Sequence, residues 1–209
     1  MADGKIVVVD YGRGNLNSVS KALEKVGAKV RVSSSPAVVR RAGALVLPGV
    51  GAFGDAMRSL ERLKLAGPLR QARDEGRPIL GICLGMQLFY EASLEYGRHR
   101  GFGFLPGVVK RFKKGLKVPH MGWNQVRHAP GCPLFEGVAR EEDFYFVHSF
   151  HAPVNRKAFE TGWTSYGGRE FTSAILQGNL FGTQFHPEKS QSAGLKVYAN
   201  FWKHALKKR

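Results

Sequence analysis

Cys83 lies between two glycines at a point where an apolar run gives way to a helix-like segment, with residues 78–87 reading PILGICLGMQ. This pattern predicts a strand–turn–helix elbow like that of the G-x-S-x-G hydrolases, with a thiol in place of the hydroxyl. Gly81 and Gly85 leave room in a tight turn, and the start of the following helix favours the thiolate. We therefore expect a nucleophile at Cys83, the alternative being a free cysteine in a core strand.

A second segment about a hundred residues later supplies the other groups that a thiolate needs, since residues 181–188 read FGTQFHPE. Attack on a carbonyl requires a base to hold the proton and a carboxylate to orient the imidazole. His186 and Glu188 fit these two parts. Ligands gather at the carboxyl ends of parallel strands, so the loops after Leu47, Ile82 and Phe185 are expected to meet. Cys83, His186 and Glu188 then form a triad, although a single histidine at a strand end is more often structural.

Backbone donors for an oxyanion are expected in two loops. Gly49 and Gly51 flank Val50 after an apolar strand, so backbone amides can turn outward there, and the amide of Leu84 follows the nucleophile directly. A plain glycine turn is the alternative for the first loop. Gln87 lies one helical turn after Cys83 and is expected to face the same way.

The first half of the chain alternates short apolar segments with amphipathic ones, which is typical of a parallel sheet covered by helices on both faces. Residues 5–10 predict a buried strand, and Asn15 and Gly27 are suited to cap the helix between them. The other elements expected in this half are a strand at 28–33, a helix at 36–43, a strand at 44–47, helices at 53–66 and 68–76, a strand at 78–82 and a helix from Cys83 to about residue 93.

The second half changes character, because strand-like segments are separated there by glycine or proline, which suggests antiparallel additions to the sheet. A closing helix is expected from Ser192 to Lys207. No linker or repeat divides the chain, so one α/β domain over 1–209 is predicted. The strand-like segments lie at 108–113, 118–127, 143–151, 161–167, 171–177 and 180–186.

Composition narrows the function classes. No apolar run approaches the roughly 18 residues that span a bilayer, the first residues lack the apolar stretch of a signal peptide, and two cysteines, Cys83 and Cys132, do not make a disulfide framework. A cytoplasmic protein without a membrane association is expected. The net charge is +16, and residues 96–135 contain no acid. Without a nucleic-acid-binding motif, such a basic belt predicts no specific nucleic-acid partner.

The segments GICLGMQ and QFHPE together resemble the class I (triad) glutamine amidotransferase family over nearly the whole chain. The resemblance implies hydrolysis of glutamine to glutamate and ammonia through a γ-glutamyl thioester, with no cofactor and no metal. It implies that Cys83 is the nucleophile, His186 the general base and acid, and Glu188 its orienting group. Backbone amides of Val50 and Leu84 would bind the oxyanion. The substrate-binding residues that it implies are Gly49, Gly51, Gln87, Glu95, His148, Ser149 and Phe150.

Further segments, DYGRGNL at 10–16 and PHMGWN at 119–124, look like those of glutaminase subunits of imidazole glycerol phosphate synthases. That resemblance implies a (β/α)8-barrel cyclase as partner in a heterodimer, to which ammonia passes in histidine biosynthesis. Trp is a favoured interface anchor, although Trp123 could also be an ordinary half-buried aromatic. The residues expected at the partner interface are Asn15, Met121, Trp123, Asn124, Tyr145 and Lys189.

Two positions complicate this assignment. The family reads H-S-Y where this chain has His148-Ser149-Phe150, so a phenol contact to the substrate is absent if the family uses that hydroxyl. Glu95 matches an acid that the family places near the substrate amino group. On a straight helix it would lie about 18 Å along the axis from Cys83. Glu95 therefore contributes only if the helix ends early and the chain folds back, which Gly97 permits.

Other functions remain open from the residues alone. One is a related amidotransferase subunit in chorismate, purine or pyridoxal phosphate synthesis. Another is a non-catalytic basic binding protein, against which the complete triad argues. A metal site built from Cys83, His148, His151 and His186 is disfavoured, because no paired C-x-x-C or H-E-x-x-H spacing is present.

Overall fold

Five parallel strands form the centre of the molecule in the computed structural model, which describes residues 6–155 and 157–207. Their order in the sheet is β2-β1-β3-β4-β13, and every pairing among them is parallel. Lys5, at the start of the predicted strand 5–10, lies outside the described residues. The strands are β1 (Ile6–Val9), β2 (Val30–Ser33), β3 (Ala44–Gly49), β4 (Ile79–Cys83) and β13 (Leu180–Thr183).

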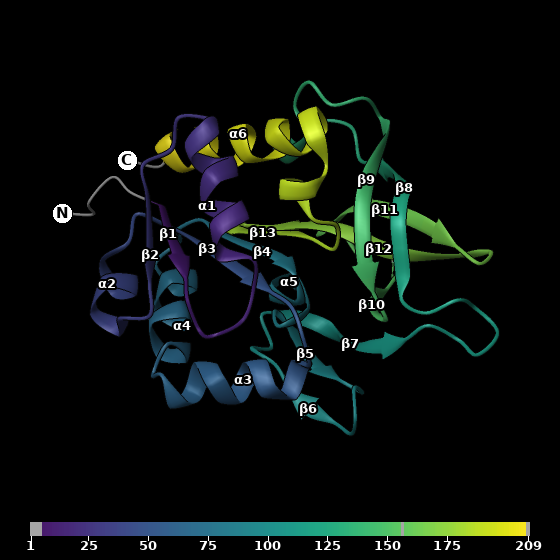
Figure 1. Ribbon diagram of the computed structural model, residues 1–209, viewed down its shortest axis with the longest axis horizontal. Coiled ribbons are helices and arrows are strands. Elements are labelled where there is room, and N and C mark those ends of the chain that lie inside the picture. Colours follow the sequence, from purple (N-terminus) through teal and green to yellow (C-terminus); the bar gives the residue numbers. More distant parts are fainter. Residues whose placement is uncertain (1–5, 156, 208–209) are drawn as a thin grey trace.

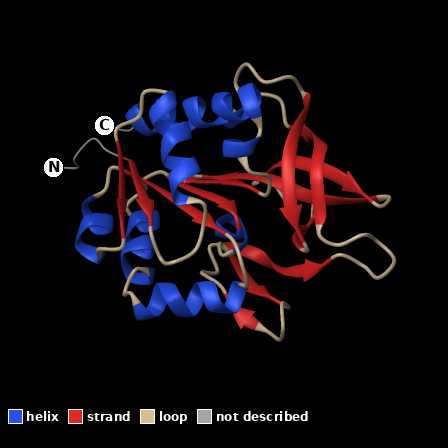
Figure 2. Ribbon diagram, viewed as in Figure 1, coloured by secondary structure: helices blue, strands red, loops and turns tan. Residues whose placement is uncertain are grey.

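Helices cover both faces of these strands (Figure 1, Figure 2). On one face lie α1 (Leu16–Lys25) and the long closing helix α6 (Gln191–Lys207). The opposite face carries α2 (Pro36–Arg41), α3 (Phe53–Arg62) and α4 (Ala66–Asp74). The arrangement is the two-sided one that the alternating sequence pattern predicts.

Side-chain alternation explains why the central strands are apolar throughout. Successive side chains of a strand point to opposite faces, and a parallel sheet covered on both faces buries both sets. In β1, Val8 packs with Val19 of α1 in the cluster on one face, whereas Val7 packs with Val39 of α2 on the other.

The second half of the chain extends this sheet with mostly antiparallel pairings (Figure 2). Strand β12 pairs with both β13 and β10, and β7, β5 and β6 continue beyond β10. A branch formed by β11, β8 and β9 stands beside them. The bounds are β5 (Tyr90–Ser93), β6 (His99–Arg100), β7 (Leu105–Arg111), β8 (His120–His128), β9 (Glu141–His148), β10 (Phe150–Pro153), β11 (Glu160–Tyr166) and β12 (Arg169–Gln177), with short 3-10 helices at Pro133–Phe135 and Pro187–Lys189.

The helix expected from Cys83 to residue 93 is wrong. Helix α5 spans only Leu84–Gln87, and the chain enters β5 at Tyr90. The cause is tertiary: the carbonyl of Leu88 accepts a hydrogen bond from the amide of Phe102, at 2.8 Å, instead of one from the next helical turn. One helical turn also provides a smaller dipole than the long helix invoked to favour the thiolate.

The predicted fold class is confirmed as a single α/β domain whose central sheet is mostly parallel, with antiparallel strands added in the second half. Within residues 6–155 and 157–207, no helix combines the length and apolar character needed to cross a membrane.

Candidate active site

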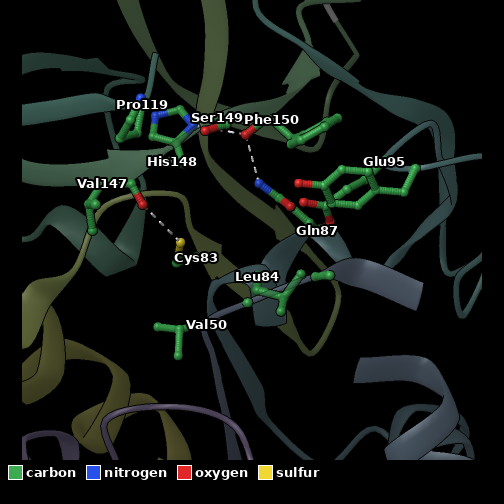
Figure 3. A pocket seen from close by; sticks show the side chains of 13 residues that line it. Val50, Cys83, Leu84, Gln87, Glu95, Pro119, Val147, His148, Ser149 and Phe150 are labelled. Carbon is green, nitrogen blue, oxygen red and sulfur yellow. Dashed lines mark hydrogen bonds between the residues drawn. The ribbon is translucent and has the colours of Figure 1, made fainter. Parts of the chain in front are cut away.

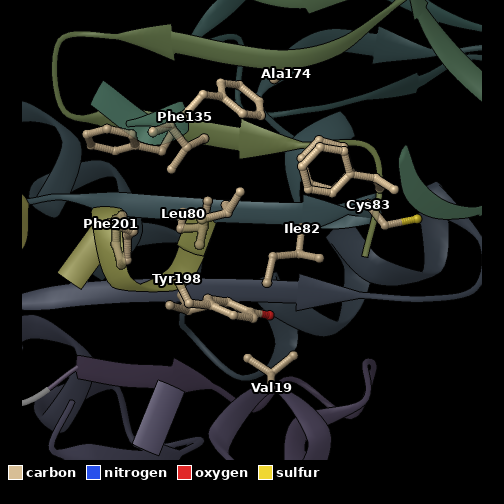
Figure 4. Close-up of a cluster of buried hydrophobic side chains, with 14 of the residues drawn as sticks. Val19, Leu80, Ile82, Cys83, Phe135, Ala174, Tyr198 and Phe201 are labelled. Carbon is tan, nitrogen blue, oxygen red and sulfur yellow. The ribbon is translucent and has the colours of Figure 1, made fainter. Parts of the chain in front are cut away.

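Cys83 occupies a sharp elbow between β4 and α5. Its φ is +53°, in the left-handed region that non-glycine residues rarely adopt. The side chain is 6% exposed and belongs to the apolar cluster beneath α6, yet its sulfur points away from that cluster (Figure 4). The predicted elbow is therefore present, and it carries the thiol out of the core.

Glycine is required on both sides of this elbow because neighbouring backbone is in contact there. A Cβ on Gly85 would collide with the carbonyl oxygen of Leu47 in β3, and one on Gly81 would come within 2.7 Å of the Gly85 backbone. Backbone atoms cannot move aside as a flexible side chain can. The two glycines thus allow β3, β4 and α5 to approach closely.

The loops expected to meet do so, because their strands are neighbours in register. Gly49 of β3 pairs with Cys83, and Thr183 of β13 pairs with Ile82 of β4. His186 follows β13 by three residues, and its amide donates to the carbonyl of Tyr145 in β9 at 2.9 Å. The imidazole is thereby tied to two different strands.

Glu188 orients the His186 ring. Its Oε1 lies 2.8 Å from Nδ1 of His186, with both side chains almost fully buried. The second carboxylate oxygen, Oε2, accepts a hydrogen bond from the hydroxyl of Tyr198 on α6, at 3.2 Å. Glu188 is therefore itself fixed, and the imidazole presents its other nitrogen, Nε2, to the interior.

That Nε2 is buried and makes no hydrogen bond with another described residue. Burial lowers the pKa of His186, but the charge of the nearby Cys83 sulfur and the Glu188 carboxylate more than offset this and raise it to about 10. Among the described residues Nε2 forms no hydrogen bond to the sulfur, and the raised pKa keeps the imidazole protonated near neutral pH. The electrostatics thus place a proton on His186, on the nitrogen that faces the interior of the site.

Two further groups approach the sulfur. The side-chain amide of Gln184 lies 3.5 Å from Sγ and donates toward it. The carbonyl oxygen of Val147 lies 3.9 Å from Sγ (Figure 3). A donor from Gln184 stabilises negative charge on sulfur, whereas the Val147 carbonyl accepts from the thiol form.

A cavity of about 440 Å³ opens in front of Cys83 (Figure 3). This volume accommodates one small polar molecule such as an amino acid. All of the residues expected to bind substrate or oxyanion line it except Gly49, which lies against Tyr11 and Leu84. Its lining consists of Val50, Gly51, Ala52, Cys83, Leu84, Gln87, Glu95, Tyr96, Pro119, Val147, His148, Ser149 and Phe150.

Gln87 is held in one orientation within this cavity. Its Nε2 donates to the carbonyl of Phe150 at 2.8 Å and to Oε1 of Gln184 at 2.9 Å. Both amide hydrogens are thus used by the protein. Gln87 consequently offers a carbonyl oxygen, an acceptor, to a bound molecule.

Glu95 reaches the cavity because α5 ends early and the chain folds back. Its Oε2 accepts a hydrogen bond from the amide of Phe53, at the start of α3, at 2.6 Å. The fold-back includes positive φ angles at Tyr96 and Gly97. The straight-helix separation considered from the sequence therefore does not apply, and a carboxylate borders the pocket.

The loop after β3 lies close beneath the elbow. A Cβ on Gly49 would stand 2.5 Å from the hydroxyl of Tyr11 and 2.9 Å from Cβ of Leu84. Gly51 has a φ of +96°, and Val50 between the two glycines is 44% exposed. The loop therefore runs along the cavity as expected of an oxyanion strand.

The segment 148–150 forms the opposite wall. His148 is buried, and the contacts of Phe150 to Gln87 and His148 are made by its backbone carbonyl. The ring of Phe150 packs against the apolar cluster containing α3 and α4. A phenol at position 150 is therefore not needed for these two contacts.

Three of the residues expected at a partner interface lie on β8, and they divide between its two faces. Met121 and Trp123 are 62% and 49% exposed, and Trp123 packs edge-on against Tyr145 of β9 with ring centroids 6.1 Å apart. The Nζ of Lys189 lies 5.3 Å from the centroid of the Tyr145 ring. Asn124 instead turns its side chain inward, where it hydrogen-bonds His120 and the carbonyl of Ser165.

Asn15 lies at the expected start of α1 and is exposed, but its side chain makes no capping hydrogen bond. The adjacent Gly14 packs against Pro48, since a Cβ there would be 3.2 Å from that ring. The loop before α1 thus lies beside the loop that carries Val50.

Sequence reasoning missed three supporting residues. Gln184 is fully buried beside the end of β13, which only the structure shows; its place in the QFHPE segment is the sequence signal for a role. Tyr198 and His120 are buried aromatic residues whose polar atoms reach Glu188 and His148. Nothing in their local sequence distinguishes them from ordinary core residues.

No group of three histidine, cysteine, aspartate or glutamate side chains that could hold a metal ion occurs within the described part of the chain. His148 and His151, considered for such a site, instead make backbone hydrogen bonds to the carbonyls of Phe150 and Ala152.

Residues 7–205 match the family model "Glutamine amidotransferase class-I". The imidazole glycerol phosphate synthase subunit HisH of Moorella thermoacetica is 50% identical over 196 residues, covering 94% of this chain and 93% of the relative. The HisH subunit of Aquifex aeolicus is 48% identical over 204 residues, covering 97% and 98%.

Solved structures with the same fold are more distant in sequence. A crystal structure titled as a glutamine amidotransferase superposes with a TM-score of 0.74 at 17% identity, covering 95% of this chain and 98% of that one. The PurLQS structure from Thermotoga maritima gives 0.73 at 20% identity, covering 98% of both chains. At these identities the structures support the fold alone.

Proposed function

The chain belongs to the class I glutamine amidotransferase family, and from this premise we propose that it is the glutaminase subunit of an imidazole glycerol phosphate synthase. Its reaction is the hydrolysis of glutamine to glutamate and ammonia in histidine biosynthesis. The observation that carries the proposal is His186: Glu188 holds its Nδ1, its Nε2 has no hydrogen-bond partner among the described residues, and Cys83 is close enough to raise its pKa.

The first half-reaction forms a thioester. The Cys83 thiolate attacks the γ-carbonyl carbon of glutamine, and negative charge develops on the carbonyl oxygen. Amides of Val50 and Leu84 are the proposed donors to that oxygen. As the tetrahedral intermediate collapses, His186 gives its proton to the leaving nitrogen, which departs as ammonia.

The second half-reaction releases glutamate. His186, now neutral, takes a proton from a water molecule as that water attacks the thioester carbonyl. Collapse of the second intermediate expels the Cys83 sulfur, and the imidazole again carries the proton beside it. Glu188 keeps Nδ1 protonated throughout, so that Nε2 is the nitrogen that exchanges protons.

Substrate recognition is assigned to the remaining lining groups. Glutamine carries an α-ammonium group, which is a donor, and the acceptors at the cavity are Oε1 of Gln87 and the carboxylate of Glu95. Backbone groups of Gly51, Ser149 and Phe150 are proposed to bind the α-carboxylate and the amide. Gly49 contributes by allowing Val50 to approach.

We propose a (β/α)8-barrel cyclase as partner. Ammonia released into water near neutral pH would mostly be protonated and lost, so the glutaminase should open directly onto an acceptor. Exposed Trp123 and Lys189 and half-buried Tyr145 form a surface patch suited to docking, and Met121 of the same strand is also exposed. We expect the complex to work in the cytoplasm.

Transfer of labelled nitrogen tests the function. Glutamine carrying ¹⁵N in its amide is supplied with this chain, the cyclase and the cyclase substrate. The label is expected in imidazole glycerol phosphate, and Cys83→Ala is expected to abolish the transfer while leaving the complex intact. Full transfer with Cys83→Ala would refute the site, and absence of label with the native chain would refute the pathway.

A further inference from the structure

A row of hydrogen-bonded side chains runs from β8 to the cavity. Asn124 of β8 lies 3.0 Å from Nε2 of His120, and Nδ1 of His120 lies 3.0 Å from Nε2 of His148. Nδ1 of His148 lies 2.8 Å from the carbonyl oxygen of Phe150, which also accepts from Gln87. The row therefore ends on the group that orients Gln87.

The bonding partners determine where the protons are. The Phe150 oxygen can only accept, so His148 donates through Nδ1–H, and in a neutral ring its Nε2 is then an acceptor. His120 must consequently donate through its own Nδ1–H and accept at Nε2. Asn124 supplies that donor and gives its second amide hydrogen to the carbonyl of Ser165. Every polar atom in the row is satisfied only when both rings are neutral.

Aromatic packing holds the His120 ring in place. It stacks on Tyr166 with centroids 4.1 Å apart and on Phe146 at 5.0 Å, and Phe112 meets it edge-on. The ring is 4% exposed. His120 therefore has neither room to rotate nor water to replace its two partners.

We propose that His120 is a positioning residue for the glutamine cavity: it holds His148 in the Nδ1–H tautomer and thereby fixes the Phe150 carbonyl and the amide of Gln87. The assignment of the cavity to glutamine rests on the proposed function above. The tautomer itself follows from the geometry alone, so the two parts can be tested separately.

The surroundings of the rings agree with a neutral pair. Burial lowers the pKa of His120 to about 4. Burial also lowers the pKa of His148, to about 3. The hydrogen bond to Phe150 opposes this shift, and the charges of His120, His151 and His186 add to it. These three histidines are the titratable groups that face His148 from β8, from β10 and from the loop after β13.

Two-bond ¹H–¹⁵N correlation spectra of the isolated chain test the tautomer, because a protonated and an unprotonated ring nitrogen have well-separated ¹⁵N shifts. The native chain is expected to show His148 protonated at Nδ1 and not at Nε2, and unchanged through mildly acidic pH. His120→Phe keeps the stacking but removes both nitrogens, and His148 is then expected to populate the other tautomer or to titrate. A native His148 protonated at Nε2 would overturn the proposal without any variant.

Kinetics with the cyclase test the consequence for glutamine. His120→Phe leaves the buried Nε2 of His148 without a donor, and KM for glutamine is expected to rise by about tenfold with a smaller change in kcat. His120→Asn places an amide N–H where Nδ1 was, and it is expected to restore KM. Equal values for the two variants, or a native KM in His120→Phe, would contradict the positioning role. If the native chain hydrolyses no glutamine, the proposed function fails, and the spectra still decide the tautomer.

Discussion

The Nδ1 nitrogen of His186 and the Oε1 oxygen of Glu188 lie 2.8 Å apart, which leaves Nε2 as the nitrogen available to the Cys83 sulfur. This division of the ring between a carboxylate and a nucleophile is what acyl transfer through a thiolate requires. Glu188 is anchored in turn by Tyr198, so the relationship extends from the cavity into α6.

Glu188→Gln is expected to reduce kcat for glutamine hydrolysis by at least about a hundredfold, because an amide cannot stabilise the imidazolium as a carboxylate does. Tyr198→Phe keeps the ring and removes only the hydroxyl bond to Glu188, so a fall of about threefold to tenfold is expected. Steady-state glutamate release with the cyclase present measures both. A larger effect from Tyr198→Phe than from Glu188→Gln would contradict this order.

Gln184→Leu is expected to slow alkylation of Cys83 by iodoacetamide by about tenfold, since the side-chain donor near the sulfur is lost. The same change frees Gln87, so KM for glutamine is expected to rise. Gln177→Leu, at an exposed end of β12, is the matched control and should leave both unchanged. An undiminished alkylation rate in Gln184→Leu would mean that the amide does not act on the sulfur.

Gly85→Ala is expected to destabilise the protein by more than about 2 kcal/mol, because its Cβ would collide with the Leu47 carbonyl, which is backbone. Gly67→Ala in α4 meets no atom within 4 Å and is the control. It should be neutral or stabilising by up to about 1 kcal/mol. Urea unfolding of the two variants measures the difference in their free energies of unfolding. Equal midpoints would show that the elbow can accommodate a Cβ at position 85.

The free energy of unfolding is expected to fall as the pH drops from about 6.5 towards 4. His120 and His148 have folded pKa values lowered to about 4 and about 3, so the unfolded chain takes up protons in this range that the folded chain does not. Each such histidine contributes a slope of up to about 1.4 kcal/mol per pH unit. Urea unfolding across this range should show a shallower slope for His120→Asn, and identical slopes would contradict the depressed pKa.

Trp123→Ala is expected to weaken association with the cyclase by at least about tenfold, since the exposed indole packed on Tyr145 is suited to be an anchor. Alkylating analogues of glutamine should still label Cys83 in the Trp123→Ala variant, because Trp123 does not line the cavity. Val32→Ala, similarly exposed on β2, is the control. Titration calorimetry measures the affinity of both variants for the cyclase. Equal affinities of Trp123→Ala and Val32→Ala would place the interface elsewhere.

Much of the first half could be predicted because its signals are local. Apolar runs such as the one ending at Ile82, followed by glycines, specify strands and tight turns with few alternatives. The elbow at Cys83 and the loop around Val50 were therefore expected where they lie. The exception is the helix expected to reach residue 93. It ends early because the amides of Phe102 and Leu105 donate hydrogen bonds to the carbonyls of residues 88 and 89, and no local sequence pattern encodes these contacts.

The supporting side chains were harder to predict because they come from segments remote in sequence. Tyr198 reaches Glu188 from the closing helix, and His120 reaches His148 across two paired strands. Gln184 bridges Gln87 and Cys83 over about a hundred residues of chain. Such contacts follow only once strand order and register are known.

The register of β4 with β13 determines how the segments that carry Cys83 and His186 lie relative to each other. Gly81 pairs with Gly182 and Ile82 with Thr183, so backbone bonds between adjacent strands set the distance from sulfur to imidazole. The long excursion that joins these strands carries Trp123 and Tyr145, and the carbonyl of Tyr145 accepts a hydrogen bond from the backbone amide of His186. A change confined to the exposed side chain of Trp123 therefore leaves this alignment intact, whereas a change that shifts the β9 backbone at Tyr145 moves the imidazole.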